Sequence, residues 1–380
     1  MSALRIAFIS PFFPLKGGIA RFSELFRSAL CQKGYDVVPV AFRALYPNFL
    51  MNSAFDGSCD SEKCRLPESR LLLYNPFTWL ATLRSIRLMK PNILLVAYWT
   101  GFLAPFCYVL HRLTGIRVVV LLHNFTSHDS FFFEPIMQRV LVASSCEFLT
   151  LSSVVSKELL TVAPNSRVLQ LFHPLYEPEK GRPSRADARR TLQLDASAPV
   201  LLFFGYVRPY KGLDMLLKAL PEILRKERML KLVIAGEFYE NLAIYQDMIW
   251  KLGISVSVDL YPGYVSPERS ALFFCAADAV VLPYRSATQS GVLQQAYGYA
   301  LPVLVTPEGA LPDVVRHGST GWIAPETSAP GLVAVVGEFL DGRNKLPAMR
   351  SAIAELGREF SWETFAVAAA RFLEAEAGEQ

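Results

Sequence analysis

The chain has 380 residues, which is too long for one typical domain and enough for two domains that each bury a core. Hydrophobic residues make up 52% and charged residues 19%, a composition that excludes disordered and fibrous proteins. The formal net charge of +4 is too small to indicate a nucleic-acid partner.

The cysteines and the apolar segments indicate a cytoplasmic protein. The closest cysteines, Cys59 and Cys64, lack the second ligand pair of a zinc site, so we expect reduced thiols and no metal centre. The apolar run Ile6–Ile9 is too short for a signal peptide. The uncharged stretch 91–110 approaches the length of a membrane span, but Pro105 interrupts it, and we interpret it as a strand, a loop and an apolar helix.

The first half of the chain alternates strands and helices. A buried strand at residues 5–9 leads into a loop rich in proline and glycine and then into apolar residues at helical spacing from Ile19 to Leu30. Further strands are predicted at residues 35–40, 93–96 and 117–122. This alternation predicts an α/β fold with a parallel sheet covered on both faces.

A second α/β region follows a stretch rich in proline and charge. Strands are predicted at 199–204, 231–235, 279–282 and 302–305, with a helix at 213–225. We therefore expect two Rossmann-like domains that face each other across a crevice and bind ligands at the carboxyl ends of their strands. The predicted parts are a first domain at residues 1–173, a linker at 174–198, a second domain at 199–358 and a helix at 359–380 that returns to the first domain.

Three loops place anion-binding groups after predicted strands. Gly17 and Gly18 open the first helix, where free backbone N–H groups favour an anion. Arg208 and Lys211 follow the first strand of the second domain, where fixed positive charge suits a departing diphosphate. A third helix start holds candidate phosphate and ribose contacts at Thr288, Gln289, Ser290, Gly291, Val292 and Gln295.

Histidines follow the strand at 117–122 in the first domain. His123 comes directly after the strand and is followed by Asn124. His128 lies nearby and is followed by Asp129. A histidine at the carboxyl end of a strand is a candidate functional residue, with a structural role as the alternative.

The segment Leu71–Lys90 combines large apolar residues with three cations. Arg84, Arg87 and Lys90 follow at spacings of three on one helical face. Aromatic and basic residues together suit the surface of an anionic membrane, whereas an ordinary core and a solvated face remain the alternative.

Together these motifs resemble family 4 of the retaining glycosyltransferases, which have the GT-B fold. The resemblance runs from Gly17-Gly18 to the last helix, which begins at Phe360-Ser361-Trp362-Glu363. It places Gly17 and Gly18 near the donor diphosphate, His123 at the donor sugar, Lys211 at the diphosphate, and Gly263 and Tyr264 at the base.

The sequence departs from the family at three positions. The family's arginine falls at Tyr206, so we take Arg208 as its substitute. The two glutamates of the family's Glu-x7-Glu motif are replaced by Ala287 and Gln295, which leaves the donor-sugar contact to Thr288 or Gln289.

The resemblance implies metal-independent transfer of a sugar from a nucleotide-diphosphate sugar, with retention of configuration and without a protein nucleophile. It further implies a glycan or lipid-linked glycan acceptor in surface polysaccharide or lipopolysaccharide assembly, at the inner face of the plasma membrane. The donor is a substrate, so no cofactor is expected. A nicotinamide oxidoreductase is disfavoured because Gly-x-Gly-x-x-Gly is absent. A GT-B epimerase and a non-catalytic partner subunit remain alternatives.

Overall fold

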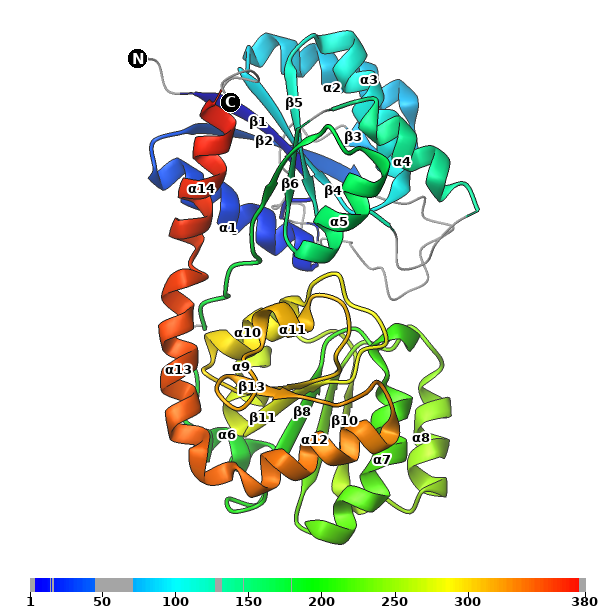
Figure 1. Cartoon of the computed structure of the whole chain (residues 1–380), viewed down its shortest axis with the longest axis vertical. Helices are drawn as coiled ribbons and strands as arrows, with labels where there is room; N and C mark the ends of the chain where they lie inside the picture. Colours follow the sequence, from blue (N-terminus) through cyan, green and yellow to red (C-terminus); the bar gives the residue numbers. More distant parts are fainter. Residues whose placement is uncertain are drawn as a thin grey trace. The chain divides into compact units, whose positions relative to one another are not determined.

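The computed structural model describes residues 4–13, 15, 17–44, 71–126, 132–145, 147–178 and 180–375 (Figure 1). The chain forms two compact units. The first comprises Met1–His173 and Ser361–Gln380, and the second comprises Pro174–Phe360. The predicted Cys59–Cys64 pair lies outside the described residues.

The described residues of the first unit form a seven-stranded parallel sheet in the order β3-β2-β1-β4-β5-β6-β7. In chain order the strands are β1 (Arg5–Ser10), β2 (Asp36–Ala44), β3 (Leu71–Leu72), β4 (Ile93–Tyr98), β5 (Arg117–Leu122), β6 (Glu147–Thr150) and β7 (Arg167–Gln170). The strand order reverses between β1 and β4, which places the loops after these two strands beside each other.

Helices cover both faces of this sheet, as the alternating pattern predicts. One face carries α1 (Gly18–Gln32) and α14 (Trp362–Glu374). On α1 the apolar residues at helical spacing, such as Phe22 and Phe26, are buried against the sheet. The other face carries α2 (Pro76–Met89), α3 (Ala104–Thr114), α4 (Glu134–Val142) and α5 (Ser153–Val162).

The uncharged stretch 91–110 has the structure predicted for it. It contains β4, the short 3-10 turn η4 (Gly101–Leu103) and the first part of α3. Pro105 stands in the first turn of α3, where its missing N–H breaks no hydrogen bond. Among the described residues, no helix is both long enough and apolar enough to span a bilayer.

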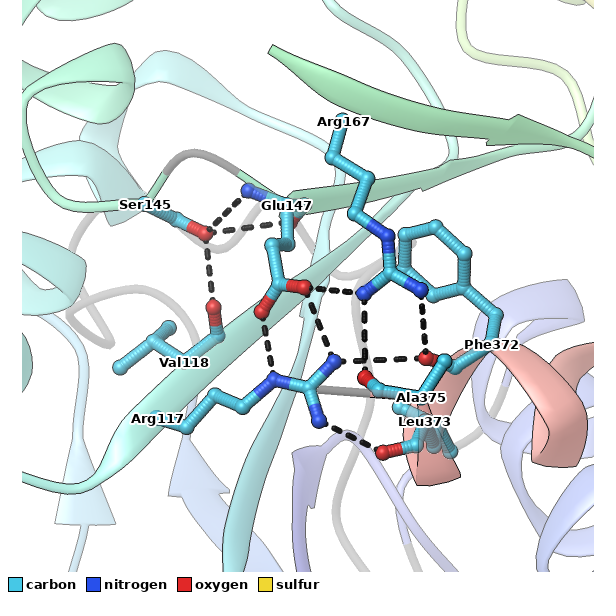
Figure 2. Close-up of polar contacts among 8 residues, drawn as sticks. All are labelled: Arg117, Val118, Ser145, Glu147, Arg167, Phe372, Leu373 and Ala375. Atoms are coloured by element: carbon cyan, nitrogen blue, oxygen red, sulfur yellow. Dashed lines mark hydrogen bonds and ion pairs between the residues drawn. The ribbon is translucent and has the colours of Figure 1, made fainter. Parts of the chain in front are cut away.

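A charged cluster connects the end of α14 with the amino ends of β5, β6 and β7 (Figure 2). Glu147 accepts hydrogen bonds from Arg117 (Nε–Oε2 2.6 Å) and Arg167 (Nη1–Oε1 2.5 Å). Both arginines also donate to carbonyls at the end of α14, including those of Phe372 and Leu373. Cations suit the negative end of a helix dipole, and the predicted return of the C-terminal helix to the first domain is confirmed.

The second unit is built around a six-stranded parallel sheet in the order β10-β9-β8-β11-β12-β13. Its strands are β8 (Val200–Phe204), β9 (Lys231–Gly236), β10 (Val258–Pro262), β11 (Ala279–Leu282), β12 (Val303–Val305) and β13 (Gly321–Ile323). All residues of β8 are buried and alternate between the two faces: Leu201 and Phe203 pack on one side, Leu202 and Phe204 on the other.

Helices again cover both faces. One face carries α7 (Leu213–Lys226), α8 (Leu242–Lys251) and α12 (Ala329–Asp341). The other carries α6 (Arg185–Thr191), α9 (Pro267–Ala276), α10 (Gly291–Gly298) and α13 (Leu346–Glu359). Shorter elements are η5 (Pro209–Lys211), η6 (Ser255–Ser257), α11 (Leu311–Val314) and η7 (Arg343–Lys345).

The stretch 174–198 differs from the linker that its composition suggests, since the structure assigns it to the second unit. It contains α6, which packs against α9, and Arg189 of α6 is buried. The Arg189 guanidinium donates to Asp278 (2.8 Å) and to four backbone carbonyls. A charged residue with this many partners is part of a core, and composition alone does not reveal such partners.

Candidate functional site

The predicted diphosphate loop lies where the strand order of the second sheet reverses. From β8 the chain proceeds outward to β9 and β10, whereas from β11 it proceeds the other way to β12 and β13. The loops that follow β8 and β11 therefore meet at the carboxyl edge of the sheet, where open α/β sheets bind ligands. Gly212 allows this contact: its φ is +67°, and a Cβ there would lie 2.0 Å from the carbonyl oxygen of Pro283.

Lys211 reaches into this meeting point. Its side chain is only 7% exposed, and a Cβ built on Gly205 would lie 3.4 Å from both the Lys211 Nζ and the Val292 Cγ2. The ammonium thus lies at the first turn of α10. Among the described residues it has no hydrogen bond or ion pair, and it lies 5.5 Å from the centroid of the Tyr284 ring.

Burial, with a smaller contribution from the charge of Arg208, lowers the pKa of Lys211 to about 8. The side chain therefore remains largely protonated at neutral pH. A buried cation with nothing to neutralise it is costly unless an anion arrives from outside.

Arg208 stands beside Lys211 and is held by an aromatic pair. Its guanidinium lies 4.2 Å from the centroid of the Tyr239 ring, and that ring packs edge-on against Tyr206 at 5.2 Å. Arg208 thus occupies the same neighbourhood as Tyr206, where the family's arginine would fall. Tyr239 was missed from the sequence, although an aromatic residue soon after the end of β9 was an available signal.

The start of α10 supplies backbone donors next to Lys211. The Ser290 hydroxyl caps the helix by accepting from the Leu293 N–H (3.2 Å), so its lone pairs are partly used. The N–H groups of Gly291 and Val292 head the helix, where no intrahelical acceptor exists for them. Thr288, just before this turn, is buried.

The Gln295 side chain and the Ala287 backbone have partners within the second unit. Gln295 Nε2 donates to Ser270 Oγ on α9 at 3.0 Å. Gln289 is half-buried beside the cap, and the Ala287 carbonyl accepts from the Ala310 N–H. The sequence alone gave no sign that α9 would provide the partner of Gln295.

Gly263 and Tyr264 lie at the end of β10. Gly263 has a φ of +108°, and its N–H donates to the carbonyl of Gly236 at the end of β9 (3.0 Å). Tyr264 is exposed and lies close enough to Tyr206 to contribute to the raised pKa of that phenol, which burial chiefly causes. Aromatic rings therefore gather at the carboxyl ends of β8, β9 and β10, a surface that suits a flat base.

In the first unit, Gly17 and His123 also lie at the carboxyl edge of a sheet. Gly17 precedes α1 with a φ of +128°, and Gly18 is the first residue of that helix. His123 follows β5 directly and is buried, and its ring packs edge-on against Phe22 of α1 at 4.9 Å. The structure thus brings His123 next to the helix that the two glycines begin.

The imidazole of His123 is neutral. Burial lowers the pKa of His123 to about 3, with a smaller contribution from His173, whose ring also packs edge-on against Phe22, at 5.2 Å. A neutral imidazole can donate one hydrogen bond and accept another, but it cannot supply positive charge. His128 and Asp129 lie outside the described residues.

Comparison with known proteins places the second unit in a family. Residues 184–359 match the family model of glycosyl transferases group 1. The match covers most of the second unit, from α6 to the end of α13. D-inositol 3-phosphate glycosyltransferase of Streptomyces scabiei is 32% identical over 210 residues, which cover 53% of this chain and 47% of that protein. The match thus spans about half the length of this relative.

Solved glycosyltransferase structures match the whole chain in fold. Sucrose-phosphate synthase from Thermosynechococcus elongatus superposes with a TM-score of 0.77 at 16% identity, over 97% of this chain and 98% of that one. Anabaena Alr3699/HepE in complex with UDP-glucose superposes with a TM-score of 0.74 at 15% identity, over 97% and 99% of the two chains. The predicted resemblance and the GT-B fold, with two parallel α/β sheets, are confirmed.

Proposed function

We propose that this chain transfers a sugar from a nucleotide-diphosphate sugar to a saccharide acceptor. The observation that carries the proposal is the buried Lys211 ammonium, which lacks a counter-charge in the described residues and lies at the first turn of α10. A diphosphate that gains negative charge as the sugar leaves would be stabilised there by Lys211, by Arg208 and by backbone N–H groups.

The remaining roles follow from the resemblance. Tyr264 and Gly263 would contact the base, the start of α10 the phosphates, and Gln295 the ribose. Gly17, Gly18 and His123 of the first unit would act at the diphosphate and the donor sugar. The acceptor attacks the face from which the diphosphate leaves, the configuration is retained, and the leaving phosphate takes the acceptor's proton. No side chain is needed as a nucleophile.

We further propose that the acceptor is a lipid-linked glycan of surface polysaccharide or lipopolysaccharide assembly. The protein would then work in the cytoplasm at the inner face of the plasma membrane. The support for this setting is the resemblance, above all the likeness of the segment 284–292, which contains Ala287, to a variant found among polysaccharide-assembly members of the family.

A thermal-shift screen over nucleoside diphosphates and their sugars tests the donor proposal. A ligand present at 100 times its Kd should add about 2.7 kcal/mol to the free energy of unfolding. Stabilisation by at least one nucleoside diphosphate is expected, and stabilisation by none would contradict the proposal. With the donor known, product analysis separates transfer to an acceptor from epimerisation, which would release nucleotide without forming a glycoside.

A further inference from the structure

The helices of the first unit differ sharply in what they expose. Among the described residues, α1 and α14 expose no large apolar side chain, whereas the helices on the opposite face of the sheet expose several. These are Phe77, Leu80 and Leu88 on α2, Tyr108 and Leu113 on α3, Ile136 on α4, and Leu160 and Val162 on α5. Among the described helices of this unit, the exposed large apolar side chains are therefore confined to those on one face of the sheet.

On α2 the exposed residues form a stripe. Phe77 and Leu88 are 85% and 83% exposed, and Leu80 lies between them at helical spacing. The opposite side of the helix buries Leu83 and Ile86 against the sheet. The stripe is thus additional to the face that anchors α2, and burial in the core does not explain it.

Each of α2, α3 and α4 carries a cation next to its exposed apolar residues. Arg84 lies one turn from both Leu80 and Leu88, Arg112 one turn after Tyr108, and Arg139 one turn after Ile136. The three arginines are exposed, and none has a hydrogen bond or ion pair among the described residues. Figure 1 shows the three helices grouped on this unit, with α3 in contact with both α2 and α4.

Acidic residues are almost absent from this side. Between Leu71 and Val142 the described residues include one acidic side chain, Glu134, which is buried. The opposite face carries ion pairs such as Lys33–Glu363 and Arg27–Glu24. A surface with unpaired cations, apolar side chains and no exposed carboxylate complements a layer of anionic headgroups above hydrocarbon.

We propose that the outer face of α2, α3 and α4 docks on an anionic phospholipid bilayer. Phe77, Leu80 and Leu88 enter the boundary between headgroups and acyl chains, and Arg84, Arg112 and Arg139 contact the headgroups. This sharpens the expectation from the sequence, because Arg87 donates to the carbonyl of Leu113 and has a role within the fold. The docking face does not depend on the proposed transfer chemistry.

Co-sedimentation of the full chain with vesicles tests this surface. The vesicles contain phosphatidylcholine alone or with phosphatidylglycerol, and the first variant combines Arg84→Gln, Arg112→Gln and Arg139→Gln. Each cation should contribute about fivefold to partitioning, so the variant should lose on the order of 100-fold on anionic vesicles. Binding of the unchanged chain should also weaken as salt rises.

The matched control combines Arg225→Gln, Lys226→Gln and Arg228→Gln. These exposed cations of the second unit have no partner among the described residues, and the control lowers the net charge by the same amount. The control should keep nearly full binding. A second variant, Phe77→Gln with Leu88→Gln, changes only exposed side chains and should lose binding even at low salt.

Three results would overturn the docking surface: no binding to anionic vesicles at low salt, equal losses in the two charge variants, or full binding by the Phe77→Gln, Leu88→Gln variant. Capture of an acidic protein in place of vesicles would assign the face to a protein partner and also overturn it. Thermal shift with nucleoside diphosphates, measured without vesicles, should be unchanged in every variant. The docking surface and the donor proposal can therefore fail separately.

Discussion

Two buried cations of the second unit lie at opposite ends of the same two strands. Arg189, 1% exposed, lies at the amino ends of β8 and β11, where Asp278 also accepts from the Val200 N–H. Lys211, 7% exposed, lies near the carboxyl ends of these strands. The Arg189 side chain makes five hydrogen bonds, whereas the Lys211 ammonium makes none among the described residues.

The difference separates a cation that stabilises the fold from one that is available to a ligand. A buried charge is tolerated when hydrogen bonds and a counter-charge replace its water, and Arg189 meets both conditions. The Arg117–Glu147–Arg167 cluster of the first unit follows the same rule at the amino ends of its strands. Lys211 does not meet these conditions within the unit, so we expect it to contribute to binding and not to stability.

The largest effect on stability is expected for Arg189→Leu. This change leaves Asp278 buried with only the half-exposed Arg185 as a cationic partner and leaves four carbonyls short of a donor. Breaking a buried ion pair costs about 3–5 kcal/mol of unfolding free energy. Urea unfolding measures the loss, and Arg190→Leu, an exposed neighbour on the same helix, is the control. Equal unfolding free energies of the two variants would contradict the stabilising role assigned to Arg189.

For Lys211→Ala we expect slower transfer without a loss of stability. Loss of one fixed stabiliser of a developing charge typically lowers the rate by on the order of 10²–10³. The unfolding midpoint should not fall, because no partner is left unsatisfied. Transfer kinetics and urea unfolding on the same preparation measure both, with the exposed Lys218→Ala as the control. A normal rate, or a loss of stability as large as that of Arg189→Leu, would refute the assignment.

Arg208→Ala should also slow transfer, by a smaller factor than Lys211→Ala, since Arg208 is less buried. Its guanidinium is already placed by the Tyr239 ring. If transfer by Arg208→Ala matches that of the unchanged chain, another residue takes the place of the family's arginine.

The affinity for a nucleoside diphosphate should depend moderately on pH, because Lys211 titrates. Its pKa in the folded chain is about 8, below its usual 10.5, so the ammonium loses its proton above pH 8. Nucleoside diphosphate binding should therefore weaken by up to about tenfold per pH unit above that value. In Lys211→Arg this loss of affinity should move to a pH well above 8. The same loss of affinity in that variant would mean that another group titrates.

Loss of the Lys211 proton weakens binding but should raise the unfolding free energy. Between pH 8 and 10.5 the unfolded chain binds more protons at this residue than the folded chain does. The unfolding free energy of the unchanged chain should therefore rise through this window relative to Lys211→Met. Paired urea titrations at pH 7.5 and 9.5 measure the difference, and a relative loss of stability would contradict the lowered pKa.

The smallest effect is expected from a chelator. The sequence has no Asp-x-Asp after a strand, and the proposal assigns diphosphate neutralisation to Lys211, Arg208 and the start of α10. Excess EDTA should change the transfer rate by less than about twofold, since no step relies on a divalent ion. Loss of activity that magnesium or manganese restores would show that the fixed cations are insufficient.

The sequence predicted the features that depend on local pattern. Buried strands, helix starts and the loop with Lys211 follow from apolar periodicity and from glycine and proline positions, so both sheets and the switch-point loop could be anticipated. Features that depend on distant partners could not. From the sequence, Arg189 is one of the charged residues of the predicted linker, because its partner Asp278 lies 89 residues further along the chain. Tyr239 belongs to no motif that would identify it. Gln295 finds Ser270 only once α9 and α10 are packed.

Calorimetric titration of a nucleoside diphosphate tests the central claim most directly. The ligand identified by the thermal-shift screen is titrated into the unchanged chain, into Lys211→Met and into Lys218→Met at pH 7. The account predicts that Lys211→Met weakens binding by at least tenfold, about 1.4 kcal/mol, while Lys218→Met binds like the unchanged chain. Equal affinity in all three proteins would contradict it, because the buried Lys211 ammonium would then not face the diphosphate.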